Sequence, residues 1–241
     1  MCLAPLGVGG LQPSDHALLP GRLQDHVHPL RRLAGNDRMV LVVDEQQLAA
    51  GLDALVLDVK TGSGAVLPEA ARGRELARLM IATAATAGLR VSALLTDMSE
   101  PLARSAGNAL ELHEAVSILR GEPCAPRLLE VTLALGAEVM VLGGLAADLD
   151  AARAALIRTL ASGAAAGKFS RMVASLGGPR DLLERREAYL AKAPVVRDVP
   201  APRGGFVSAI DTRAIGLAVV ALGGGRTAPG QAIDPAVGFD R

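Results

Sequence analysis

A strand–helix–strand pattern between residues 54 and 96 restricts the fold of this chain more than any other feature. Ala54–Lys60 and Val91–Thr96 are nearly continuous apolar runs of strand length, which is typical of strands buried on both faces of a parallel sheet. Between them, Glu69–Ala87 has helical spacing and Gly88 is well placed to end the helix. The positions that share one helical face are Leu76, Leu79, Met80 and Thr83. Parallel strands joined by a helix form a βαβ crossover, so we expect an α/β fold.

The rest of the chain is predicted to be mostly helical, with one further strand near the C terminus. Asp148 and Asp211 stand where N-caps belong, and Gly223–Gly225 ends the last helix. The predicted helices are 107–119, 128–142, 148–165, 168–176, 180–191 and 211–222. A short apolar run at Met39–Val43 comes before them, a linker is predicted at 194–202, and a strand is predicted at 205–210.

The N-terminal residues differ in composition from the rest. They are rich in proline and arginine, lack periodicity, and hold His16, His26 and His28. A histidine-rich tract can bind metal, and an irregular leader has the same composition. We therefore divide the chain into an irregular leader at 1–38, an α/β domain with a helical segment at 39–192, and a partial C-terminal α/β portion at 193–241.

Composition narrows the possible partners and compartment. Lys+Arg and Asp+Glu are equal at 25 each and only 2% of residues are aromatic, which disfavours nucleic acid and anionic membranes as partners. No apolar run reaches the roughly 18 residues of a membrane span. Cys2 and Cys124 form neither a metal nor a disulfide pattern, and we expect a reduced, cytoplasmic setting.

Two motifs have glycine or arginine near a predicted strand or helix end. Asp58–Gly64 joins a strand to a glycine-bearing loop, and ligands of open parallel sheets bind beyond such strand ends. The segment is equally compatible with an ordinary tight turn. Arg213 and Arg226, near the predicted helix at 211–222, are candidates for contacting a phosphate or for surface ion pairs.

A third motif follows the second strand. Glu111 and Glu114 are three residues apart, on neighbouring positions of one helical face, with His113 between them. Two such carboxylates can bind a cation or share a proton. A solvated acidic face with a surface histidine is the other interpretation.

These motifs occur in an order that resembles the thymidine/pyrimidine-nucleoside phosphorylase family. The resemblance covers roughly residues 46–241 and depends on several blocks together. The blocks are Gly51–Ala65, Thr96–Met98, Ser105–Ala109, Phe206–Ser208 with Asp211–Arg213, Gly223–Arg226, and Ile233–Phe239. It implies a large mixed-sheet α/β domain of the nucleoside phosphorylase type.

The resemblance also implies an activity. Enzymes of this family are homodimers that cleave a pyrimidine nucleoside with phosphate, releasing the base and a pentose 1-phosphate. For this chain, it implies phosphorolysis of thymidine to thymine and 2-deoxyribose 1-phosphate, without an organic cofactor. The family positions that contact the base correspond to Gln46 and Val66, which differ from the usual residues.

The resemblance also implies a binding site for a monovalent cation, potassium. Two backbone carbonyls and a glutamate form part of it in the family, and the matching positions are Leu102, Ser105 and Glu114. The phosphate loop and the helical domain of the family have no counterpart in this sequence. We therefore expect the chain to be incomplete relative to the family, and a catalytically inactive family remnant is the alternative to an active phosphorylase.

Overall fold

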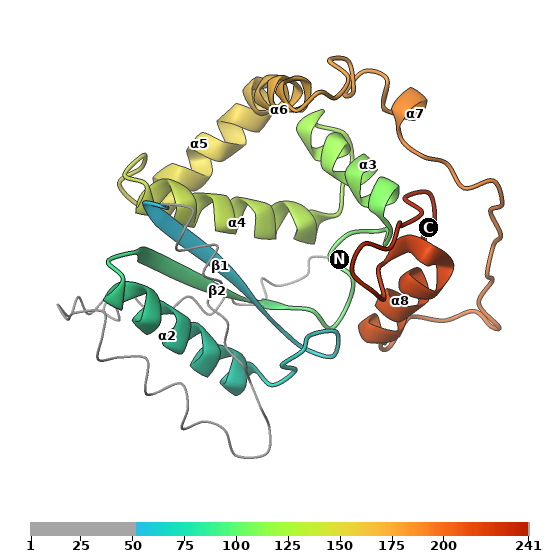
Figure 1. Ribbon diagram of the computed structural model, residues 1–241, viewed down its shortest axis with the longest axis horizontal. Helices are drawn as coiled ribbons and strands as arrows, with labels where there is room; N and C mark the ends of the chain where they lie inside the picture. Colours follow the sequence, from blue (N-terminus) through green and yellow to red (C-terminus); the bar gives the residue numbers. More distant parts are fainter. Residues whose placement is uncertain (1–51, 241) are drawn as a thin grey trace.

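The computed structural model describes residues 52–240, and its centre is a pair of parallel strands joined through one helix (Figure 1). Strand β1 spans Ala54–Thr61, helix α2 Ala70–Thr86 and strand β2 Arg90–Asp97. The register pairs Ala54 with Arg90 and Thr61 with Asp97, so both strands end at the same edge. The predicted βαβ unit and the α/β class are confirmed.

Helix α2 covers one face of the sheet. Val59 and Ala93 on the strands pack with Ala77 on the helix, which is fully buried. The half-buried side chains around this cluster are Leu57, Leu76, Ile81 and Leu95. Small residues make the closest contact, because Gly73, Ala77 and Ala84 are the buried positions of α2. The larger residues of the predicted face, such as Leu79, are only half-buried.

Helix α4, Pro126–Leu142, lies on the other face and runs antiparallel to β2. Ser92 Oγ donates to Glu138 Oε2 at 2.7 Å, and Arg90 donates to the Leu142 carbonyl oxygen at 2.8 Å. Helix α5, Leu149–Ala161, packs on α4, with Ala152 completely buried. Asp148 caps α5 as predicted, accepting from the Ala151 amide at 2.7 Å.

Three predictions about the helices beyond residue 148 need correction. The helix predicted at 148–165 ends at Ala161, because Gly163 adopts a left-handed φ of 74°. Helix α6 then spans Ala164–Ser175, four residues earlier than its predicted start. In the region predicted as a helix at 180–191, only α7, Arg186–Tyr189, is helical. Leu182 and Leu183 are nevertheless buried there.

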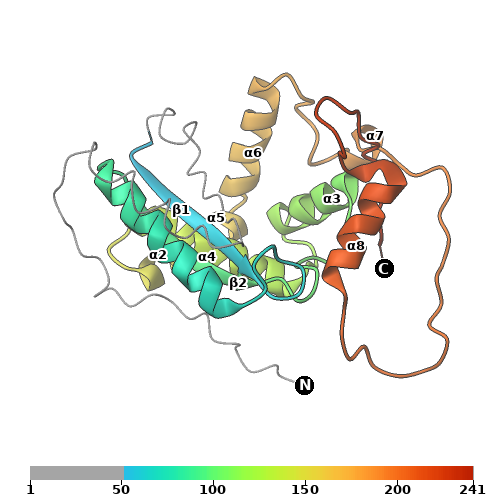
Figure 2. The same cartoon turned by 60° about the horizontal axis from the view of Figure 1, so that its bottom comes forward.

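The strand predicted at 205–210 is not formed. These residues have no neighbouring strand in the described part of the chain, and Phe206 is fully exposed. A strand needs a partner to satisfy its backbone groups. Residues 205–210 belong instead to an extended strap, residues 193–210, which includes the predicted linker. The strap projects from the molecule in both views (Figure 2).

The C-terminal segment packs against the N terminus of helix α3, Asn108–Leu119. Helix α8, Thr212–Val219, is capped by Asp211 as predicted and continues into the turn η3, Val220–Gly224, where Gly223 has a φ of 94°. An antiparallel bridge then joins Phe239 to Ala106, just before α3. The apolar run at 39–43 and the leader at 1–38 lie outside the described residues.

Candidate functional site

The loops that follow β1 and β2 are bound together beyond the carboxyl ends of the strands. The Met98 amide donates to the Thr61 carbonyl oxygen at 2.6 Å, and the Gly64 amide donates to the Met98 carbonyl oxygen at 3.0 Å. Backbone pairing therefore continues past the last strand residues. This edge is where ligands of parallel sheets bind, so it is the candidate site.

Two glycines make this close approach possible. A Cβ on Gly62 would collide with the Asp97 carboxylate and the Ser99 hydroxyl, and Gly62 has a φ of 94°. A Cβ on Gly64 would lie 2.6 Å from the Met98 carbonyl oxygen and 2.8 Å from Thr212 Cγ2. These glycines therefore admit neighbouring protein segments, which is the tight-turn interpretation of the Asp58–Gly64 motif.

A polar chain crosses the two strands just before this edge. Lys60 Nζ forms an ion pair with the Asp58 carboxylate, whose other oxygen accepts from Thr96 Oγ1. All three side chains lie on the α4 face, because residues two apart on a strand share a face and Lys60 pairs with Thr96. The edge of the sheet thus carries a fixed ammonium group.

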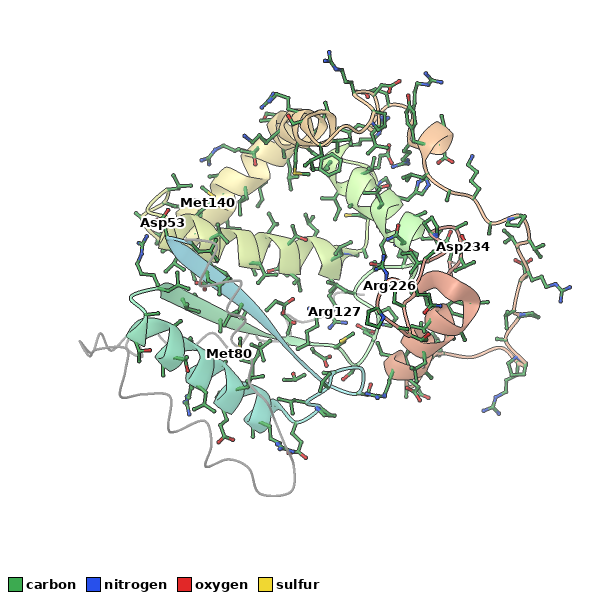
Figure 3. The ribbon with its side chains drawn as sticks, viewed as in Figure 1. Asp53, Met80, Arg127, Met140, Arg226 and Asp234 are labelled. Atoms are coloured by element: carbon green, nitrogen blue, oxygen red, sulfur yellow. The ribbon has the colours of Figure 1, made fainter. Side chains whose placement is uncertain are left out.

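Arg127 connects the first turn of α4 to the loop after β2 (Figure 3). It donates to the Asp97 carbonyl oxygen and forms an ion pair with Glu100 at 2.7 Å. Asp97 in turn accepts from the Ser99 amide at 3.0 Å. These bonds fix the loop and use two of the five N–H donors of the Arg127 guanidinium.

The predicted acidic pair does not act as a pair. Glu111 Oε1 accepts from the Gly107 amide and Glu114 Oε1 from the Arg104 amide, each at 3.1 Å. The two carboxylates are thus bonded to different backbone amides, Glu111 to that of Gly107 and Glu114 to that of Arg104. His113 points elsewhere, with Nδ1 3.6 Å from Glu187 Oε1.

The three positions expected to bind potassium lie in one place. The amide that Glu114 binds belongs to Arg104, which lies within the segment from Leu102 to Ser105. Ser105 is 7% exposed, and its hydroxyl has no hydrogen-bond partner within residues 52–240. Carboxylate and backbone oxygens are suitable ligands for a hard cation.

The two positions expected to contact the base are Gln46 and Val66. Gln46 lies outside the described residues. Val66 stands in the loop after β1 and is 91% exposed.

The predicted phosphate contacts Arg213 and Arg226 are not brought together by any described interaction. Arg226 Nε donates to the Gln231 carbonyl oxygen at 2.9 Å within its own turn, near Asp234 (Figure 3). Arg213 is exposed in the first turn of α8. Neither arginine forms an ion pair within residues 52–240.

An ionic network that sequence reasoning missed fixes residues 181–192 to α3. Glu122 accepts from Arg120, from Arg186 at 2.8 Å and from Ser117 at 3.1 Å. The hydrogen bond from Arg120, supported by those from Arg186 and Ser117, holds the pKa of Glu122 below its usual value despite partial burial. Arg120 also donates to the Leu183 carbonyl oxygen at 2.7 Å. No periodicity marks the contacts of Arg186 with Glu122 and of Arg120 with Leu183, since they join residues 64 and 63 positions apart.

The same segment contains two further perturbed groups. The Tyr189 hydroxyl donates to Asp181 at 2.7 Å, which raises the pKa of Tyr189 and lowers the pKa of Asp181. The hydrogen bond from Lys192 lowers the pKa of Glu187. All of these groups are exposed or half-buried, so they are structural contacts rather than candidates for proton transfer.

Residues 52–240 contain no cluster of three or more His, Cys, Asp or Glu that could hold a metal ion. In the same residues, no helix is long and apolar enough to cross a membrane.

Comparison with known proteins matches two parts of the chain to families. Residues 24–166 match the family described as glycosyl transferase family, a/b domain, and residues 206–241 match the pyrimidine nucleoside phosphorylase C-terminal domain. Proteins named thymidine phosphorylase from Burkholderia lata, Burkholderia cenocepacia and Burkholderia orbicola are each 54% identical over 194 residues. Each alignment covers 80% of this chain and 44% of the relative. The chain therefore spans less than half the length of the curated relatives it matches.

Proposed function

Because this chain belongs to the glycosyl transferase family, a/b domain, and also matches the pyrimidine nucleoside phosphorylase C-terminal domain, we propose that it takes part in the phosphorolysis of thymidine. The products are thymine and 2-deoxyribose 1-phosphate. The observation that carries the proposal is the 54% identity to thymidine phosphorylases over 194 residues. Both family matches also occur in the chain in the expected order, with the C-terminal one last.

The proposed reaction sets clear physical requirements. A phosphate oxygen forms a bond to the anomeric carbon of the sugar while the bond from that carbon to the base nitrogen breaks. The base leaves with the bonding electron pair and takes up a proton. The site must hold phosphate in line with the leaving base and stabilise negative charge on both. We propose that the loops beyond β1 and β2 form one wall of this site, and that Val66 and Gln46 are the positions that contact the base.

Incubating the purified chain with thymidine and inorganic phosphate, and measuring thymine by liquid chromatography, tests the proposal. We expect thymine release that depends on phosphate and gives an equal amount of sugar 1-phosphate. A reaction without phosphate is the matched control. Thymine release at the same rate in that control would contradict phosphorolysis.

A second candidate is a family member that does not catalyse phosphorolysis by itself. The alignment with the Burkholderia lata protein covers only 44% of that protein, and this partial coverage favours the second candidate. The same incubation distinguishes the two, since this candidate gives no thymine at any phosphate concentration. It would still bind a ligand or a second subunit through the two parts of the chain that match the families.

We propose further that potassium binds at Leu102, Ser105 and Glu114, through two carbonyl oxygens and the carboxylate. The hydrogen bond from the Arg104 amide to Glu114 supports this, because it holds the carboxylate beside the segment that contains Leu102 and Ser105. Thermal unfolding in potassium chloride and in tetramethylammonium chloride at equal ionic strength tests it. A higher melting temperature in potassium, lost in Glu114→Gln, is expected; equal melting temperatures in the two salts would contradict it.

The proposal also includes a homodimer that works in the cytoplasm. Exposed large side chains on helices α5 and α6, and just after α4 and α6, support a subunit contact; they include Leu145, Ile157, Met172 and Leu176. Cys124 is a free, half-buried thiol, which suits a reducing compartment. Sedimentation equilibrium should give twice the 24.7 kDa chain mass, and a single-chain mass at all concentrations would contradict the dimer.

A further inference from the structure

The face of the sheet covered by α4 carries polar side chains at both ends of the strands, with Arg90 and Ser92 near the start of β2 and a second group near the carboxyl ends. Val56 on β1 and Leu94 on β2 are apolar, but Asp58, Lys60 and Thr96 follow them on the same face. Strands covered by helices on both faces are usually apolar throughout. Arg90 and Ser92 are bonded to α4, whereas Asp58, Lys60 and Thr96 are bonded to one another.

The polar side chains hold one ammonium group at a defined place. Asp58 binds Lys60 Nζ through one carboxylate oxygen and accepts from Thr96 through the other. Asp58 is thereby fixed from the neighbouring strand, and its side chain is only 25% exposed. Lys60 is 44% exposed, and an ammonium group has three donors. Two donors are therefore left for a ligand.

The edge around this ammonium group carries charges of both signs, with Asp97 and Glu100 beside Arg127. Both strands end one residue further on, at the edge where ligands of parallel sheets bind. The N terminus of α4, with its partial positive charge, contacts the same edge through Arg127. Arg127 donates to Glu100 and to the Asp97 carbonyl oxygen, and both Arg127 and Lys60 keep further N–H donors.

We propose that Lys60 is a phosphate-binding residue, contacting the inorganic phosphate of the reaction through the donors that Asp58 leaves free. This inference rests on the proposed function, which supplies phosphate as the substrate. It identifies the Lys60 ammonium as preorganised positive charge at the end of β1. No role of this kind follows from the sequence, because the pairing of Asp58 with Thr96 depends on the strand register.

Isothermal titration of the full chain with inorganic phosphate tests the role of Lys60. Lys60→Gln removes the charge and is expected to weaken phosphate binding by about 10- to 100-fold. Lys60→Arg keeps the charge and donors and should stay within about 5-fold of the unaltered chain. Lys192→Gln is the matched control, because Lys192 is also an ion-paired lysine, with Glu187 at 3.1 Å, and it should leave the affinity unchanged.

Two results would overturn the inference. One is a Lys60→Gln chain that binds phosphate as tightly as the unaltered chain. The other is an unaltered chain that does not bind phosphate. Circular dichroism of each variant shows whether it is folded. If Lys60→Gln unfolds, the Lys60→Arg chain decides, because a folded Lys60→Arg chain must bind phosphate. Loss of phosphate binding in a folded Lys60→Arg chain counts against the inference.

The failure of this inference is distinguishable from failure of the proposed function. Phosphate-dependent thymine release by the unaltered chain, together with unchanged release by Lys60→Gln at low phosphate, leaves the function standing and removes Lys60 from it. Phosphate binding that depends on Lys60, without thymine release, supports the lysine and contradicts catalysis by this chain.

Discussion

Gly64 is the residue on which the joined loops at the end of the sheet depend most directly. Its Cβ, if present, would lie 2.6 Å from the Met98 carbonyl oxygen and 2.8 Å from Thr212 Cγ2. Gly64→Ala should therefore lower the free energy of unfolding by about 1–3 kcal/mol through overpacking. Urea denaturation measures the change.

A glycine in open space gives the matched control. Gly167 lies in helix α6, and a Cβ there would meet only Arg171 Nη1 at 3.7 Å. Gly167→Ala should raise stability by about 0.5–1 kcal/mol, because alanine loses less entropy in a helix. Equal effects of the two substitutions would show that close approach at Gly64 is unimportant.

Glu122 should make stability depend on pH. Its folded-state pKa is lowered, chiefly by the Arg120 hydrogen bond, so the carboxylate contributes stability above its unfolded pKa of about 4.3. That contribution is lost as pH falls through the lowered folded-state value. We expect Glu122→Gln to weaken the loss of stability between pH 6 and pH 3, measured by urea denaturation at each pH.

The control for Glu122 is an exposed glutamate of α2, Glu75. Glu75→Gln should leave the pH dependence as it is in the unaltered chain. If Glu122→Gln and Glu75→Gln gave the same profile, the network around Glu122 would not contribute to stability.

At the scale of elements, the N-cap of α5 allows a direct test. Asp148 accepts from the Ala151 amide at 2.7 Å, so Asp148→Ala should lower the free energy of unfolding by about 1 kcal/mol. Asp150 lies in the first turn of the same helix without serving as the cap. Asp150→Ala loses only the interaction with the helix dipole and should cost less; a loss as large as that of Asp148→Ala would contradict capping.

The elements that sequence predicted well are those with a strong period. β1, α2 and β2 were each predicted within two residues, because apolar runs and helical spacing are local properties. The strand at 205–210 was wrong, since a strand needs a pairing partner and the described part of the chain provides none. The helix at 148–165 was too long, because alanine-rich sequence outweighed Gly163, whose left-handed φ ends α5.

The candidate site was predictable in position but not in its contacts. Two parallel strands that end together place residues 61–66 and 97–99 at one edge, and this follows from the crossover alone. The partners of Glu111 and Glu114 could not be predicted, because helical spacing does not say which backbone amide folds back onto each carboxylate. Lys60 needed the register of the two strands as well.

At the scale of the whole molecule, the C-terminal segment is held against α3 by a small number of contacts. Ala106 and Phe239 exchange two backbone hydrogen bonds, of 2.9 and 2.8 Å, and the Ala109 amide donates to the Pro235 carbonyl oxygen at 3.0 Å. A Cβ on Gly238 would collide with the Ala106 carbonyl oxygen. Gly238→Ala should therefore release the segment and increase hydrogen exchange at the Ala106, Ala109 and Phe239 amides.

Gly216→Ala serves as the control, since a Cβ at Gly216 meets nothing within 4 Å. Exchange at the same three amides should stay slow in that variant, as measured by mass spectrometry of short peptides. Slow exchange in Gly238→Ala as well would show that other contacts hold the segment.

The strap has a consequence for how the C-terminal segment stays attached. Residues 193–210 make no hydrogen bond or ion pair within the described part of the chain, so they serve as a tether. When the bridge at Phe239 opens, the tether keeps the released segment near its docking site at an effective concentration of the millimolar order. A single protease cut in the strap would turn this rapid intramolecular return into an encounter between two molecules. Dilution, which has no effect on the intact chain, would then separate the two pieces.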